Sequence, residues 1–181
     1  MRRIAIALLL CSACGVAPQP RSARTVAAFE VPVFTKSDRD ALVALLRRYA
    51  APEGFHVDAA SDEENKQLSE VSPITINATV WQGKSDDEPI ASVIDGADHI
   101  GLGWLTFSKS KEPERTARFR DSVMTEIKVR WPKTAALPIM PTGAIPLHEV
   151  LVLTKGGYRV KPDAASKYEL PASSPLIADH G

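Results

Sequence analysis

Two short clusters of histidine and aspartate are the first candidates for chemistry in this chain. His56 and Asp58 stand two residues apart in an alternating segment, so a strand would place both side chains on one face. A carboxylate beside an imidazole can orient it as a general base or as a metal ligand. No third group accompanies the pair, and a solvated strand face is the favoured interpretation.

A second cluster, formed by Asp95, Asp98 and His99, lies in a turn ahead of an apolar segment. Oxygen and imidazole ligands together suit zinc and other divalent ions, which would indicate a metal-dependent enzyme. Aspartate followed by glycine or histidine is also ordinary turn chemistry, and a turn is the preferred interpretation. The sequence therefore predicts no cofactor and no metal site. If a metal ion were bound, these three residues would be the candidate ligands.

The remaining charges form no motif. The acidic runs 62–64 and 86–88 lack the spacing of a calcium loop. Basic residues between 115 and 130 alternate with acidic ones, which is typical of a solvated helix face. The chain has 22 basic and 22 acidic residues, so no large field of one sign is available to hold nucleic acid.

Aromatic and apolar residues offer two candidate binding surfaces. Trp81, Trp104 and Phe107 fall in strand-like segments and could line a pocket. Gly101 and Gly103 leave one strand face bare, which would form an open shallow groove near Trp104 or, in the preferred interpretation, be covered by Trp81. Segment 132–147 holds several prolines, which exclude a regular helix and predict an ordered crossing loop. Unless it packs against the sheet, this loop would present apolar side chains to a protein partner: Leu137, Ile139, Met140, Ile145 and Leu147.

Apolar periodicity predicts the elements that position these residues. One helix should begin at a Ser37 cap, and a second at Pro113, with apolar residues at helical spacing on one face of each. Ser61 and Glu64 have the spacing of a capping box, which indicates a short helix. Alternation indicates strands near 29–33, 55–59, 74–81, 90–94 and 100–107, and a hairpin around Gly156 and Gly157.

The order of these elements predicts the fold class. A run of adjacent strands lies between the two main helices, and a hairpin follows the second helix. This order favours an α+β fold, in which an antiparallel sheet of four to six strands carries two main helices on one face.

The first fifteen residues have the composition of a targeting segment. Basic residues at 1–3 precede an apolar run at 4–10, and Cys11-Ser12-Ala13-Cys14-Gly15 follows at once. This order of a positive end, an apolar centre and small residues indicates a secretory leader. The apolar run is too short to span a bilayer as a helix, which takes roughly 20 residues.

This segment resembles the signal sequence of bacterial lipoproteins, in which a small residue precedes a cysteine that receives a diacylglycerol. Ser12-Ala13-Cys14 fits the last three positions, although Cys11 stands where leucine is usual. The resemblance implies cleavage before Cys14, lipidation of Cys14 and attachment to a membrane of the bacterial cell envelope. Gly15, in place of an aspartate after the cysteine, favours the outer membrane, facing the periplasm.

These observations predict four segments and a function class. The segments are a signal peptide (1–13), a lipidated cysteine with a flexible tether (14–28), a single α+β domain (29–162) and a loose tail (163–181). Cleavage would leave the folded part without a free thiol, since Cys11 and Cys14 are the two cysteines of the chain.

With no convergent catalytic groups, the sequence favours a non-enzymatic envelope lipoprotein that binds another protein. Such a protein could be an inhibitor or immunity protein, or an accessory to an envelope complex. The alternatives are a carrier of a small apolar ligand and, less favoured, a metal-dependent enzyme.

Overall fold

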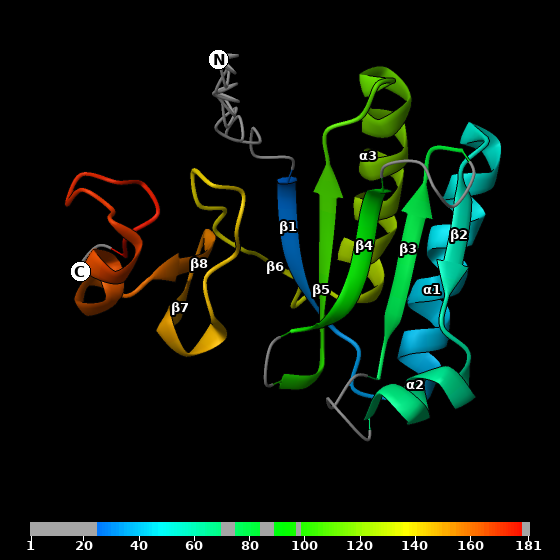
Figure 1. Ribbon diagram of the computed structural model, residues 1–181, viewed down its shortest axis with the longest axis horizontal. Coiled ribbons are helices and arrows are strands. Elements are labelled where there is room, and N and C mark those ends of the chain that lie inside the picture. Colours follow the sequence, from blue (N-terminus) through cyan, green and yellow to red (C-terminus); the bar gives the residue numbers. More distant parts are fainter. Residues whose placement is uncertain (1–24, 70–74, 84–88, 97–98, 179–181) are drawn as a thin grey trace, which may run out of the picture.

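A six-stranded antiparallel sheet is the centre of the fold (Figure 1). The computed structural model describes residues 25–69, 75–83, 89–96 and 99–178. The strands lie in the order β2-β3-β4-β5-β1-β6, and all five neighbouring pairs are antiparallel. Their bounds are β1 Thr25–Pro32, β2 His56–Ala59, β3 Asn77–Trp81, β4 Pro89–Gly96, β5 His99–Ser108 and β6 Ala135–Ala136.

Two long helices, α1 (Lys36–Ala50) and α3 (Pro113–Arg130), pack side by side on one face of this sheet (Figure 1). This arrangement confirms the predicted α+β fold class and the number of strands. A short helix, α2 (Asp62–Ser69), follows β2. Three short 3-10 helices complete the helical elements of the described residues: η1 (Ala51–Glu53), η2 (His148–Val150) and η3 (Pro162–Tyr168).

The helix starts follow local capping chemistry. Thr35, and not Ser37 as predicted, caps α1, because its hydroxyl accepts the Asp38 N–H at 3.1 Å while Ser37 already lies in the first turn. The predicted capping box at α2 is confirmed: Ser61 N–H donates to Glu64 Oε2 (2.8 Å) and Glu64 N–H donates to Ser61 Oγ (3.2 Å).

The main hydrophobic core lies between the sheet and the two long helices. It contains the apolar faces of α1 and α3 that the sequence periodicity predicted, together with the side chains of β3, β4 and β5 that face the helices. Phe119 is fully buried at its centre, with its ring edge-on to Phe55 and Phe107 at centroid distances of 5.7 and 6.2 Å. Such contacts fix the position of α3 on the sheet.

An ion-paired glutamate joins η1 to α3 beside this core. Arg118 donates to both carboxylate oxygens of Glu53, from Nε at 3.1 Å and from Nη2 at 3.0 Å. Arg115 donates to the Glu53 carbonyl and lies over the Phe55 ring. The hydrogen bonds from Arg118 hold the pKa of the Glu53 carboxyl below its usual range. The basic residues predicted to be a solvated face therefore include two, Arg115 and Arg118, that fasten α3 to η1.

A second, smaller core covers the opposite face of β1 and β5. The segment after α3 crosses this face, pairs briefly with β1 as β6, and then forms the hairpin β7 (Leu151–Thr154) and β8 (Gly157–Val160). The hairpin confirms the prediction made from the Gly156-Gly157 turn. Apolar residues of all these elements form the second cluster: Ala28, Trp104, Leu137, Val150, Leu151, Val160 and Ala164.

The described domain extends beyond the predicted 29–162 at both ends. Thr25 to Ala28 pair with β5, so the last part of the expected tether belongs to the sheet. The expected loose tail is also wrong for residues 163–178, because Ala164 and Ala165 are buried and Ile177 bridges to Val160. These residues fold because they cover the second core, which local sequence composition does not reveal.

Candidate functional site

A buried cluster of polar side chains joins the C-terminal hairpin to the sheet. Glu30, on β1, is 5% exposed, and three groups converge on its carboxyl. Trp104 Nε1–H donates to Oε2 at 3.2 Å, the Tyr158 hydroxyl donates to Oε1 at 2.6 Å, and His148 Nε2 lies 3.1 Å from Oε2. The residues come from β1, β5, β8 and η2, so this cluster fastens the C-terminal segment to two central strands.

The geometry of this cluster explains how a carboxyl group is tolerated in a small core. An ionised carboxylate is an acceptor only, and converging donors replace the water that it loses on burial. Burial and the hydrogen bond to Glu30 raise the pKa of Tyr158 above its usual range, so its hydroxyl keeps its proton and remains a donor. The His148 ring packs edge-on against Tyr158, with centroids 5.3 Å apart.

Carboxyl, imidazole and phenol groups can perform acid–base chemistry, but here burial keeps the carboxyl and the imidazole largely away from solvent. The exposed fraction of the side chain is 7% for Glu30 and 20% for His148. The cluster is therefore described best as a structural anchor for the hairpin. The sequence did not reveal this cluster, because Glu30 and Tyr158 are 128 residues apart. The one available signal was a glutamate within an otherwise apolar strand.

The anchored hairpin presents an unprotected strand edge. In the described residues, β7 pairs with β8 alone, so its other edge carries no strand. Two of its apolar side chains are exposed, Val152 by 37% and Leu153 by 59%, and Leu147 just before η2 is exposed by 48%. Exposed apolar side chains along an open strand edge are features of a docking site for an extended peptide.

The predicted contact surface at 132–147 is largely wrong. Leu137 and Met140 are buried, and Ile139 and Ile145 pack half-buried against the second core. The loop is ordered as predicted, but it uses its apolar side chains to cover the sheet. Of the five residues expected to meet a partner, Leu147 alone is exposed.

The predicted aromatic pocket is also wrong. Trp104 and Phe107 are three residues apart on β5, so their side chains lie on opposite faces of the strand. Trp104 belongs to the second core and Phe107 to the first. Trp81 lies on β3, which is separated from β5 by β4, so the three side chains cannot line one cavity.

Phe34, and not Trp81, covers the strand at Gly101. This glycine has a φ of +87°, and a Cβ added to it would lie 2.7 Å from Phe34 Cδ1. Gly103 faces Val33 and Val93 in the main core. The glycines therefore admit neighbouring side chains and do not form an open groove.

The first metal candidate is an isolated exposed pair. His56 and Asp58 share one face of β2, as predicted, with His56 Nε2 2.7 Å from Asp58 Oδ1. The exposed fraction of their side chains is 60% and 52%. No group of three histidine, cysteine, aspartate or glutamate side chains that could hold a metal ion occurs among the described residues.

At the second metal candidate, Asp95 is occupied by backbone donors. Its carboxylate accepts the N–H groups of Thr75, Ile76 (2.9 Å) and Gly101 (3.2 Å), and the Thr75 hydroxyl at 2.8 Å. It thereby fastens the segment just before β3 to β4, which contains Asp95, and to β5, which contains Gly101. Asp95 is therefore a strand residue and not part of the predicted turn. The predictions for Asp98, the His99 side chain, the acidic run 86–88 and Cys14 fall outside the described residues and side chains.

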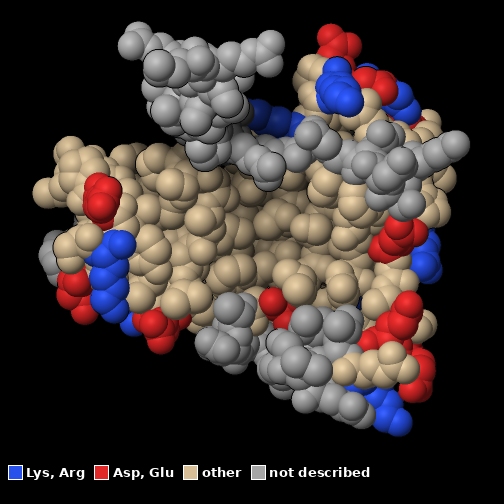
Figure 2. All heavy atoms as spheres, in the orientation of Figure 1, with Lys and Arg blue, Asp and Glu red and all other residues tan. Residues whose placement is uncertain are grey.

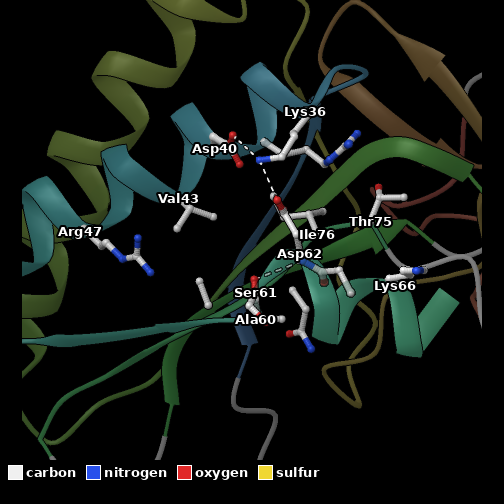
Figure 3. Close-up of a pocket in the computed structure, with 14 residues that line it drawn as sticks. Lys36, Asp40, Val43, Arg47, Ala60, Ser61, Asp62, Lys66, Thr75 and Ile76 are labelled. Carbon is white, nitrogen blue, oxygen red and sulfur yellow. Dashed lines mark hydrogen bonds and ion pairs between the residues drawn. The ribbon is translucent and has the colours of Figure 1, made fainter.

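The structure also contains a cavity of about 640 Å³ that the sequence did not predict. It lies between α1, α2, the end of β2 and the start of β3, with charged residues from both helices in its lining (Figure 3). This volume is within the range of small-molecule sites. It lies near the β2 edge of the sheet, whereas the hairpin lies beyond the β1–β6 edge (Figure 1).

Comparisons with known proteins identify no family. No family model, no curated protein and no solved structure matches this chain. None of the helices in the described residues is long and apolar enough to cross a membrane.

We predict that Tyr158→Phe lowers the free energy of unfolding by about 1–3 kcal/mol, because it leaves Glu30 Oε1 buried without its donor. Urea denaturation at neutral pH measures this change. The matched control is Tyr49→Phe, since the Tyr49 hydroxyl lies 3.4 Å from Glu126 Oε2 on a partly buried surface. We expect a change within about 0.5 kcal/mol for the control. Equal effects of the two substitutions would contradict the anchoring role of Glu30.

Proposed function

We propose that this protein is a lipid-anchored domain of the bacterial cell envelope that binds another envelope protein through the open edge of β7. Binding, and not catalysis, is its proposed activity. The partner is an extended segment with apolar side chains, which adds to the hairpin as a third strand. An inhibitor or immunity protein, or an accessory to an envelope complex, would act in this way.

The observation that carries the proposal is the chemistry of the β7 edge. Its residues, Leu151 to Thr154, include no charged residue and no proline, which are the usual protection of an edge strand. Alternate residues of such a strand direct their backbone N–H and C=O groups outwards, where a partner strand can pair with them. The exposed side chains of Val152 and Leu153 then add apolar contact area.

The surface charge is compatible with such a partner. Figure 2 shows the middle of the sheet face opposite the helices as largely uncharged, with both signs of charge at its margins, including the end that carries the C-terminal segment. A mixed margin of this kind gives no long-range attraction for nucleic acid. Backbone pairing and apolar contact would therefore dominate the interaction.

The lipid anchor supports the proposal by raising the local concentration of the domain. The leader and the Ser12-Ala13-Cys14 sequence favour acylation of Cys14, and more than one chain is needed for stable attachment. A four-residue strand edge is a small interface. Confinement to the same membrane as the partner increases the effective concentration, so a weak contact is sufficient.

The first prediction of this proposal concerns the contact surface. A photo-crosslinking residue placed at Leu153 should capture a distinct envelope protein in intact cells, because this side chain is 59% exposed on the open edge. The same probe at Val129, which is 78% exposed on α3, should not capture that protein. Immunoblotting and mass spectrometry of the adducts distinguish the outcomes.

A capture at Leu153 that Val152→Asp abolishes would support strand addition, since the charge would disfavour apolar contact. Adducts formed equally from positions 153 and 129 would contradict the proposed edge. A dimer of this chain as the sole adduct at position 153 would replace the envelope partner by a second copy.

The second prediction concerns the anchor. Wild-type protein grown with radiolabelled palmitate should carry the label and sediment with membranes after a carbonate wash. Cys14→Ala should lose both properties, whereas Cys11→Ala should keep them, because the residues on both sides of Cys14 are small. Membrane retention of the Cys14 variant would contradict the anchor without affecting the argument for the β7 edge.

A further inference from the structure

The strand β2 is the outermost strand of the sheet, on the side away from the C-terminal hairpin (Figure 1). Val57 and Ala59 pack against the main core, so His56 and Asp58 project from the opposite face of the strand. The side chains of His56 and Asp58 are 60% and 52% exposed, and they pair with each other. Within the part of the chain that the structure describes, neither makes a further hydrogen bond or ion pair, so a ligand can reach both.

This pair has suitable atoms for a zinc ion but too few of them. Imidazole nitrogen and carboxylate oxygen are both common zinc ligands. His56 Nε2 lies 2.7 Å from Asp58 Oδ1. Tetrahedral ligands with bonds of about 2.0–2.1 Å lie about 3.3 Å apart, so a small side-chain rotation would place both atoms on one ion. A structural zinc site has four protein ligands, and the described residues of one chain hold no group of three.

The backbone of β2 shows how further ligands could reach this pair. The Ala60 N–H donates to the Asn77 carbonyl at 2.9 Å, and hydrogen-bonded pairs alternate along an antiparallel ladder. His56 and Asp58 therefore direct their backbone groups to β3, whereas Val57 directs its N–H and C=O to the open side of β2. No other strand of the described residues pairs with that side.

Pairing of this edge with a second copy of the chain would bring four ligands together. When Val57 exchanges both backbone hydrogen bonds with Val57 of a second copy, His56 of each copy lies directly opposite Asp58 of the other. These are non-hydrogen-bonded pairs, whose Cα atoms lie about 4.5 Å apart and whose side chains share one face of the sheet. Two carboxylates balance the charge of Zn²⁺, and two neutral imidazoles complete a tetrahedral set.

We infer that the β2 edge forms a two-fold symmetric dimer held by one zinc ion, which His56 and Asp58 of both copies coordinate. A second copy is the occupant of this edge because the site is incomplete in one chain and because each histidine meets an aspartate across the two-fold axis. The inference goes beyond the proposed binding at β7. The β2 edge and the hairpin lie at opposite ends of the sheet, so the dimer leaves β7 open (Figure 1).

Native mass spectrometry of the purified full chain supplied with zinc chloride tests the inference. We expect a dimer that carries one zinc ion, and a monomer after chelation with EDTA. One zinc ion on a monomer, or no zinc on the folded protein, would overturn the inference. A dimer that persists in EDTA would overturn the role of the metal.

Two aspartate variants test the ligands. Asp58→Ala should abolish the zinc-dependent dimer and raise the dissociation constant of zinc by more than about 100-fold, because losing direct ligands costs more than the 10–100-fold effect of outer-shell partners. Asp121→Ala is the matched control, since it removes an aspartate with a 69% exposed side chain from α3. Equal losses of zinc binding in the two variants would overturn the assignment.

The substitution Val57→Pro separates strand pairing from metal ligation. It removes the N–H that would pair with the second copy, while β3 does not use that N–H and both zinc ligands remain. We expect a variant that is folded by circular dichroism and monomeric in zinc, and Asp58→Ala tests the dimer even if the proline variant does not fold. A zinc-bound dimer of the folded proline variant, or loss of the dimer in Val152→Asp of β7, would overturn the β2 interface.

Discussion

The buried carboxyl group of Glu30 is the constraint on which the C-terminal part of this structure depends. A carboxylate removed from water is costly unless its oxygens are satisfied, and here donors from β5 and β8, together with His148, surround it. Trp104, Tyr158 and His148 all reach the Glu30 carboxyl only when the hairpin sits at one particular position on the sheet. The apolar contacts of the second core supply area, whereas the glutamate specifies which position is adopted.

The sheet is covered on both faces, and Glu30 fixes the cover of the second face alone. The main core joins α1 and α3 to one face along β3, β4 and β5. The second core covers the other face at β1 and β5, and leaves the edge of β7 exposed. The chain thus displays a short apolar strand on a hairpin that the second core and Glu30 hold against the sheet. The cavity lined by α1 and α2 lies near β2, at the opposite end of the sheet from the hairpin.

Much of the fold could be predicted from the sequence because its determinants are local. The spacing of Phe119, Val123 and Ile127, the Ser61–Glu64 capping box and the Gly156-Gly157 turn each act within a few residues. Alternation likewise indicated the strands, and the order of elements indicated the α+β class. The start of α1 was predicted two residues too late, because Thr35 and Ser37 are both good capping residues and Thr35 is the one that accepts the Asp38 N–H.

The candidate sites could not be predicted because they depend on distant contacts. The apolar residues of the 132–147 loop indicate a surface or a core equally well, and the strands that they cover were needed to decide between the two. Composition suggested a loose tail after 162, yet Ala164 belongs to the second core and Ala165 is buried. The cavity likewise requires the relative positions of α1 and α2, which no local pattern contains.

The most direct test of this account is native-state hydrogen exchange in Glu30→Gln compared with wild-type protein. If the glutamate fixes the C-terminal segment to the sheet, amide exchange will accelerate selectively in β6, the β7–β8 hairpin and η3. Exchange in β3 and β4, which belong to the main core, will then stay unchanged. Unchanged exchange in the hairpin, or equal acceleration throughout the sheet, would contradict the claim that Glu30 holds this segment in place.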